Sequence, residues 1–308
     1  MKAILWMGLG CALALGAAWA WGPLAGASAA DKAARPPRDP VVAVGSRVTW
    51  DVPYVTGGGA SQSLDIYSPR DAHDAPVVVY VHRGEWIKGD KSEVSFKPKL
   101  LNESGTVLVS VNYRLSEEAQ HPAQVDDVAA AVRWVYDHIA DYGGSPERIV
   151  LMGHSAGCHI ASMVGLDPRP LAKVGLTPGV LRGVVCWSGG AYDLPAKVAE
   201  KGRYGPYIEA NFGKDPESQR DASPITHTAQ ADPNVHFLFV SAGDGKAGSR
   251  LLSERMAAAI TSAGAPAEAL TIEGKDHFHT DYECGLPGDD TGVFLLDFIE
   301  RAAPASPE

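Results

Sequence analysis

The chain has little of what marks metal-binding, disulfide-rich or nucleic-acid-binding proteins. It contains only four cysteines in 308 residues, and none is spaced as in a metal site or frequent enough for a disulfide-dense scaffold. Basic residues are scarce as well: 27 Lys and Arg stand against 37 Asp and Glu, the formal net charge is −10, and no local run of Lys or Arg occurs. This charge leaves no basic face for nucleic acid, so we expect a small neutral or weakly charged partner.

Three cysteines remain if the N-terminal segment is removed: Cys158, Cys186 and Cys284. Three cannot all pair within one chain, so at least one is a free thiol or bonds another chain. Cys158 and Cys186 lie in apolar stretches, and this context favours small buried hydrophobic side chains.

The N-terminus has the pattern of a targeting segment. Lys2 precedes a long uncharged stretch that ends in Ala27-Ser28-Ala29, which is typical of a secretory signal and its cleavage site. An uncleaved membrane anchor is the alternative, and association with a membrane is expected only in that case. Residues 1–29 are thus predicted as signal peptide or anchor and residues 30–46 as a Pro-containing linker. Both versions place the folded domain outside the cytoplasm, exported to the periplasm or secreted.

From residue 47 to about 303, short apolar runs alternate with helical patterns. The helical pattern is clearest after residue 120, where Val125, Val128, Val132, Val135 and Ile139 recur at helical spacing before Gly143-Gly144. Such alternation predicts a single α/β domain with a mostly parallel central sheet and helices on both faces. The predicted strands cover residues 63–67, 76–82, 106–113, 148–153, 183–188, 235–243 and 267–273.

The stretch LMGHSAGCH places Ser155 between Gly153 and Gly157, directly after a predicted buried strand. A tight turn that starts a helix explains this pattern without chemistry. The alternative is a nucleophile elbow, in which the serine hydroxyl is exposed at the end of a strand. That interpretation requires an acid and then a histidine later in the chain, and an oxyanion-binding loop before the serine.

The sequence meets each requirement at the end of a predicted strand. Gly84 follows the strand that ends at His82, Asp244 follows residues 235–243, and His277 follows residues 267–273. The carboxyl ends of parallel strands share one edge of a sheet, so these groups are expected to lie together. Asp276 and Asp281 are rival acids, but both are so close in sequence to His277 that reaching its ring would strain the loop.

These motifs resemble the α/β-hydrolase fold esterases, specifically the hormone-sensitive-lipase-like and arylformamidase-like carboxylesterases. VYVHRGEW resembles their oxyanion loop, VNYRL followed by HPAQVDDVAAAVRWV resembles their next signature, and GHSAGCH resembles their elbow. The resemblance covers about residues 64–299. It implies Ser155, Asp244 and His277 as the catalytic triad.

The same resemblance implies that the backbone N–H groups of Gly84, Glu85 and Ala156 form the oxyanion hole. The chain departs from the family where Arg83, Glu85 and Cys158 replace common glycines. A carboxylate at Glu85 would repel an oxyanion unless it points away or pairs with Arg83.

The functional expectation is a serine hydrolase that cleaves short-chain carboxylic esters through an acyl-enzyme, with a small-molecule ester as substrate and no cofactor or metal. A small cap is expected at residues 191–230, with Trp86, His154 and Tyr192 as candidate pocket residues. The alternatives are an aryl formamidase, a peptidase-type hydrolase using the same triad, or a non-catalytic binding protein with this fold.

Overall fold

An eight-stranded sheet forms the centre of the computed structural model, which describes residues 40–244 and 247–305. The strand order is β1-β2-β4-β3-β5-β6-β7-β8. β1 with β2 and β2 with β4 pair antiparallel, and every other pair is parallel. The strands are β1 (Arg47–Pro53), β2 (Ser63–Ser68), β3 (Ala75–Val81), β4 (Val107–Val111), β5 (Gly144–His154), β6 (Leu181–Trp187), β7 (His236–Ala242) and β8 (Ala267–Ile272).

The central strands are apolar throughout because both of their faces are covered. In β3, Val77, Val79 and Val81 belong to the core on one side of the sheet, whereas Val78 and Tyr80 belong to the core on the other. All five side chains are at most 1% exposed. The alternation of side chains along a strand thus supplies both cores from one uninterrupted hydrophobic run.

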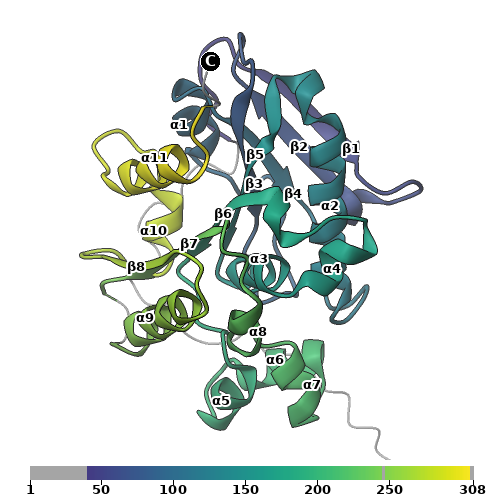
Figure 1. The fold of residues 1–308 in the computed structure, drawn as a ribbon, viewed down its shortest axis with the longest axis vertical. Helices are drawn as coiled ribbons and strands as arrows, with labels where there is room; N and C mark the ends of the chain where they lie inside the picture. Colours follow the sequence, from purple (N-terminus) through teal and green to yellow (C-terminus); the bar gives the residue numbers. More distant parts are fainter. Residues whose placement is uncertain (1–39, 245–246, 306–308) are drawn as a thin grey trace, which may run out of the picture. The chain divides into compact units, whose positions relative to one another are not determined.

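Helices cover both faces of this sheet. α2 and α3 pack in the first core, and α1 and α11 pack in the second. α9, α10 and α11 follow one another along one side of the molecule, coloured yellow-green to yellow (Figure 1). The α-helices outside the segment between β6 and β7 are α1 (Lys97–Glu103), α2 (Ala123–His138), α3 (Ala156–Leu166), α4 (Pro168–Lys173), α9 (Ala247–Ser262), α10 (His279–Tyr282) and α11 (Thr291–Ala302).

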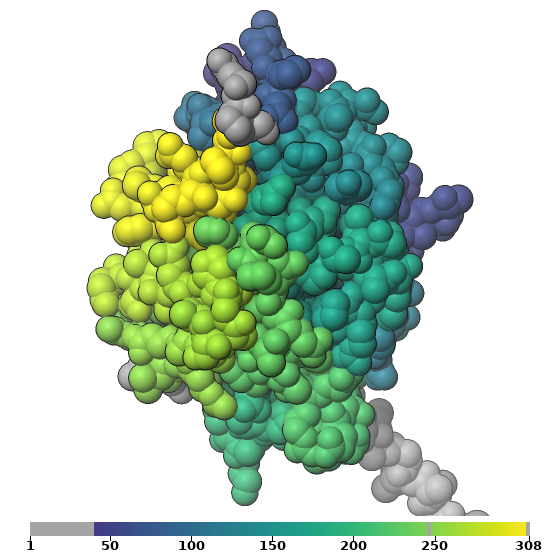
Figure 2. All heavy atoms as spheres, viewed as in Figure 1, coloured from purple at the N-terminus to yellow at the C-terminus, as the bar shows by residue number. Residues whose placement is uncertain are grey.

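The chain between β6 and β7 forms a group of short helices. They are α5 (Leu194–Ala199), α6 (Gly205–Phe212), α7 (Pro216–Asp221) and α8 (Pro224–His227). α5, α6 and α7 gather at the lower end of the view, and their green atoms form that end of the visible surface (Figures 1 and 2). This group occupies the position that the sequence predicts for a small cap.

All seven predicted strands are confirmed, with ends shifted by at most a few residues. β1 lies outside the seven predicted strands. The predicted signal segment lies outside the described residues. Within the described part of the predicted linker, Val41 donates to the carbonyl of Ser95 and accepts from the N–H of Lys99, so the chain is already attached to the domain there. Of the helices in the described ranges, none is both long enough and apolar enough to cross a membrane.

Candidate active site

Ser155 lies at the sharp turn between β5, which ends at His154, and α3, which begins at Ala156. Its backbone has φ 56° and ψ −110°, an unfavourable conformation for a residue with a side chain. A Cβ atom on Gly153 would overlap the carbonyl of Gly157, and one on Gly157 would overlap the carbonyl of Val81. The two glycines therefore allow the crossing of backbones that presents the serine, as a nucleophile elbow requires.

His277 reaches this serine from the loop between β8 and α10. Its Nε2 lies 3.1 Å from the Oγ of Ser155, within hydrogen-bond distance. Burial lowers the pKa of His277 below its ordinary value, and the negative charge of Asp281 opposes this effect. The imidazole is therefore neutral at pH 7 and can accept the serine proton.

Asp244 follows β7, and its carboxylate is exposed. Its backbone N–H donates to the carbonyl of Lys275 at 3.0 Å, so it lies beside the loop that carries His277. Within residues 40–244 and 247–305, no hydrogen bond joins the carboxylate of Asp244 to His277. The role of Asp244 as the orienting acid stays a prediction.

The two rival acids are bound to other groups. The carboxylate of Asp276 accepts from the N–H groups of Phe278 and His279 and pairs with His279 Nδ1 at 2.8 Å, so its oxygens are engaged just before α10. Asp281 is 1% exposed and pairs with the buried ammonium of Lys97. Neither carboxylate forms a hydrogen bond to the ring of His277 in the described residues.

The loop after β3 turns through three consecutive residues with positive φ: Gly84 at 128°, Glu85 at 52° and Trp86 at 63°. Only glycine fits the first position, since a Cβ atom there would overlap the carbonyl of Lys88. No hydrogen bond among the described residues uses the N–H groups of Gly84, Glu85 or Ala156. These three donors are therefore available for an oxyanion.

Arg83 and Glu85 each form an ion pair, but with other residues and not with each other. Glu85 forms an ion pair with Lys88 at 3.1 Å, and Arg83 forms one with Glu93 at 3.0 Å. Arg83 also lies over the ring of Phe278 at 5.4 Å from its centroid. The carboxylate of Glu85 is thus partly neutralised by Lys88, a different partner from the Arg83 that the sequence suggested.

Replacing Glu85 with glycine is expected to preserve or raise kcat. The substitution relieves a positive-φ residue and removes a negative charge near the oxyanion while keeping the N–H donor. Steady-state kinetics on a short-chain ester measure the effect, and Glu85→Gln separates the charge from the backbone conformation. A folded Glu85→Gly protein with strongly reduced kcat would instead give this carboxylate a positive role, such as contacting substrate.

The three predicted pocket residues lie in different surroundings. Trp86 is 4% exposed and packs edge-on against His159 and Phe212, the last residue of α6. His154 is completely buried beside His277. Tyr192 is also buried and packs against Phe239 in the core. Trp86 therefore links the oxyanion loop to the cap, whereas His154 and Tyr192 have no exposed surface to offer a ligand in this structure.

A disulfide joins Cys158 in α3 to Cys186 in β6. The expectation of two small buried hydrophobic side chains was wrong, because the sequence does not show that the first turn of the nucleophile helix lies against β6. The register places Cys186 beside Gly153, two residues before the serine. Cys284 is the buried free thiol, which confirms that not all three can pair.

Removing this disulfide with Cys158→Ala and Cys186→Ala is expected to lower the free energy of unfolding by about 3.5 kcal/mol, because the bond closes a loop of 28 residues. Thermal unfolding measures the loss. Cys284→Ala is the matched control, a buried cysteine without a bond, and should cost much less. Peptide mapping without reductant should recover Cys158 linked to Cys186; finding both as free thiols would contradict the assignment.

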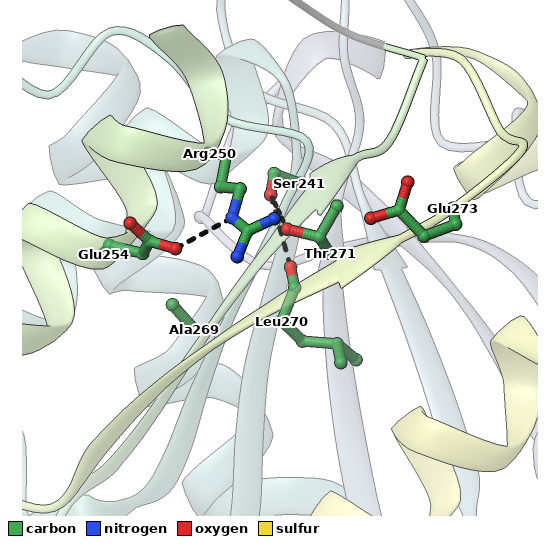
Figure 3. A pocket seen from close by; sticks show the side chains of 7 residues that line it. All are labelled: Ser241, Arg250, Glu254, Ala269, Leu270, Thr271 and Glu273. Carbon is green, nitrogen blue, oxygen red and sulfur yellow. Dashed lines mark hydrogen bonds and ion pairs between the residues drawn. The ribbon is translucent and has the colours of Figure 1, made fainter. Parts of the chain in front are cut away.

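A surface pocket of about 250 Å³ lies between β7, β8 and α9. Arg250 pairs with Glu254 beside Ser241 and Thr271, and Glu273 lies on the other side with its carboxylate directed toward the middle of the pocket (Figure 3). Neither Ser155 nor His277 lines this pocket. Arg250 and Glu254 form an ordinary exposed ion pair, so we assign this pocket no part in the chemistry.

Comparison with known proteins identifies the family. The family model BD-FAE matches residues 64–245. The chain belongs to the BD-FAE family. The match includes the loop at Gly84, the turn at Ser155 and Asp244, whereas His277 lies outside it, so the pairing of His277 with Ser155 is a finding of the structure itself.

Individual proteins also resemble this BD-FAE chain. Esterase LipQ of Mycobacterium tuberculosis is 30% identical over 238 residues, which cover 71% of this chain and 56% of LipQ. A solved structure described as a truncated carbohydrate esterase from gut microbiota has a TM-score of 0.73 at 22% identity, covering 87% of this chain and 100% of that chain. The carboxylesterase EstE1, cloned from a metagenomic library, has a TM-score of 0.66 at 25% identity, with 88% and 92% covered.

These likenesses, with the mostly parallel sheet, confirm the predicted α/β-hydrolase fold. The chain spans little more than half, or less, of the length of the curated relatives it matches. The comparisons therefore establish the family and the fold.

Proposed function

We propose that this chain is a serine hydrolase that cleaves short-chain carboxylic esters through an acyl-enzyme. The observation that carries the proposal is the 3.1 Å contact between Ser155 Oγ and His277 Nε2, made at a strained strand-to-helix turn. A nucleophile bonded to a neutral base in this way is the arrangement that acyl transfer needs. Membership in the BD-FAE family and the likeness to esterases support it.

In the proposed reaction His277 removes the proton from Ser155 as its oxygen attacks the ester carbonyl. The C–O bond of the tetrahedral intermediate then breaks, and His277 returns the proton to the departing alcohol. Water, deprotonated by His277, then attacks the acyl-serine; as the bond from the acyl carbon to Ser155 Oγ breaks, His277 returns the proton to Oγ and the acid is released. In this scheme Asp244 orients the imidazole and favours its charged form, and the N–H groups of Gly84, Glu85 and Ala156 bind the oxyanion.

Short acyl chains are proposed because the cap offers little apolar surface. Its helices are four to eight residues long. Among the described residues, the large exposed hydrophobic side chains all lie outside residues 191–230. Trp86 and Phe212 pack against each other where cap and oxyanion loop meet. Such a cap supports a short, partly polar pocket with no large apolar lid to open on a lipid surface.

We therefore expect kcat/KM to be highest for acetyl or butyryl p-nitrophenyl esters and to fall steeply for longer acyl chains, because a short pocket cannot bury the added methylenes. Rates across an acyl series from two to twelve carbons measure this preference. Emulsified substrate should give no interfacial activation. A kcat/KM that rises from the four-carbon to the twelve-carbon ester would contradict the short pocket and indicate a lipase.

An aryl formamidase or a peptidase-type hydrolase would use the same serine and histidine. Comparing the kcat/KM values for a p-nitrophenyl ester, an aryl formamide and a peptide anilide distinguishes these reactions. A binding protein of this fold would hydrolyse none of them. The small neutral ester remains the substrate class that we propose.

We further propose that the folded domain is exported, either cleaved after Ala29 or held at a membrane by residues 1–29. The disulfide between Cys158 and Cys186 supports this, since such bonds persist mainly in oxidising compartments. N-terminal sequencing of the protein recovered outside the cytoplasm distinguishes the two forms. Accumulation of the domain in the cytoplasm with its N-terminus intact would contradict export.

A further inference from the structure

A buried cluster of charged and polar side chains lies behind the catalytic histidine. Lys97 of α1 and Asp281 of α10 are at most 1% exposed, and the Nζ of Lys97 lies 2.8 Å from Oδ1 of Asp281. The hydroxyl of Tyr80 in β3 donates to the same oxygen at 3.0 Å. Lys97 also donates to the backbone carbonyl of Asp281 at 2.8 Å. Three separate elements thus meet at one carboxylate in the part of α10 that follows His277.

Such a cluster is hard to explain by stability alone. Removing two charges from water is costly, and well-packed hydrophobic residues often replace a buried ion pair without loss of stability. A buried pair does, however, fix the positions of the segments that carry it. Here those segments include the short helix that begins two residues after the catalytic His277.

His154 connects this cluster to the catalytic pair. Its Nε2 lies 2.9 Å from the carbonyl oxygen of His277, and since a carbonyl only accepts, Nε2 carries the proton and donates. Its Nδ1 lies 3.6 Å from Oδ2 of Asp281. The ring lies 4.9 Å from the ring of His277, centroid to centroid.

The place of His154 in the chain makes this contact informative. His154 directly precedes Ser155, so one side chain joins the backbone that carries the nucleophile to the backbone that carries the base. The hydroxyl of Thr280 also donates to the carbonyl of His277, but at 3.3 Å and from the same loop. Among the described residues, His154 is therefore the side-chain donor that ties this carbonyl to the elbow.

Burial and nearby charges set the protonation states in this region. Lys97 holds the pKa of Asp281 below its ordinary value despite burial, and burial keeps His154 neutral by lowering its pKa to about 3. The charged groups acting on His277 are Asp281 and Glu85, which raise its pKa, and Arg83 and Arg203, which lower it. A neutral His154 can donate to the carbonyl without placing a positive charge beside the base.

We propose that His154 is a positioning residue: its Nε2–H holds the carbonyl of His277 so that the imidazole meets Ser155, and the Lys97–Asp281 pair anchors the loop that makes this contact. The inference rests on the proposed function, because the geometry it maintains is that of the acyl-transfer pair. It concerns residues that do not touch substrate.

The test compares His154→Leu, which removes the donor, with His154→Gln, whose amide N–H retains one. We expect His154→Leu to lower kcat on the order of 10- to 100-fold with little change in KM, as expected when a reacting group is misplaced by a fraction of an ångström. His154→Gln should recover most of this loss. His227→Leu is the matched control: His227 is buried and bonds the carbonyl of Asp221 at 2.7 Å within the cap segment, so its loss should lower stability and reduce kcat far less than His154→Leu does.

A second measurement does not depend on turnover. Amide hydrogen exchange of the peptide spanning residues 276–284 should be faster, on the order of tenfold, in His154→Leu and close to wild type in His154→Gln. His154→Ala serves as the donor-free variant if His154→Leu does not fold. Wild-type exchange and wild-type kcat in the donor-free variant, or equal losses in Leu and Gln variants, would overturn the proposal. A wild-type protein without ester turnover would contradict the proposed function instead, and the exchange result would still decide the role of His154.

Discussion

Ser155→Ala is expected to lower kcat for a p-nitrophenyl ester by a factor on the order of 10⁶, the loss that accompanies removal of a serine nucleophile in another serine hydrolase. The reason is that no acyl-enzyme can form without the Oγ that lies 3.1 Å from His277. Alanine keeps the Cβ atom of Ser155 and removes only its hydroxyl. The positive-φ turn is therefore expected to retain its backbone conformation.

Thermal unfolding should show that Ser155→Ala is as stable as wild type to within about 1 kcal/mol, since a partly exposed hydroxyl is lost. Ser188→Ala is a suitable comparison. Ser188 directly follows β6, but its hydroxyl forms a hydrogen bond with the hydroxyl of Thr280. It should retain activity far above the Ser155 variant. Full ester turnover by a folded Ser155→Ala protein would remove the serine from the mechanism.

Asp244→Asn is expected to keep the fold and to lower kcat on the order of 10⁴-fold, the effect of the equivalent change in the serine protease triad. The amide cannot favour the charged imidazole and supports the wrong tautomer. Asp244 is exposed and follows the end of β7, so the change should cost little stability. Steady-state kinetics and thermal unfolding of the same preparation separate the two effects.

Asp276→Asn provides the control for position. Its carboxylate also lies beside His277 in sequence but accepts backbone N–H bonds at the start of α10, and asparagine can still accept one of them. We expect less than about a tenfold loss of kcat, because the imidazole does not depend on it. Near-normal kcat in Asp244→Asn would transfer the acid role to another carboxylate, with Asp281 tested next.

The fold was predictable because its signals are local and repeated. Uninterrupted apolar runs such as Val77 to Val81 indicate strands covered on both faces, and the spacing of Val125, Val128 and Val132 indicates a helix packed on them. The glycines around Ser155 indicate a sharp turn there, and in the structure a Cβ atom on either would overlap the backbone. The positions of Gly84 and His277 followed from the rule that strand ends share one edge of a parallel sheet.

Other features of the site depend on contacts between distant segments and carry no local pattern. Lys97 and Asp281 are separated by 184 residues, and nothing around Lys97 distinguishes it from a surface lysine. The pairing of Cys158 with Cys186 depends on how close α3 lies to β6. Glu85 was expected either to point away from the oxyanion or to pair with Arg83, and the turn of the loop brings Lys88 to it instead.

The central claim is that Ser155 is a nucleophile activated by His277. Reaction of the purified protein with a fluorophosphonate probe, followed by mass-spectrometric mapping of the modified peptide, tests it most directly. The account predicts a single phosphonylated residue, Ser155, with labelling abolished in Ser155→Ala and strongly slowed in His277→Gln. A folded wild-type protein that stays unlabelled, or one labelled at another serine, would contradict it.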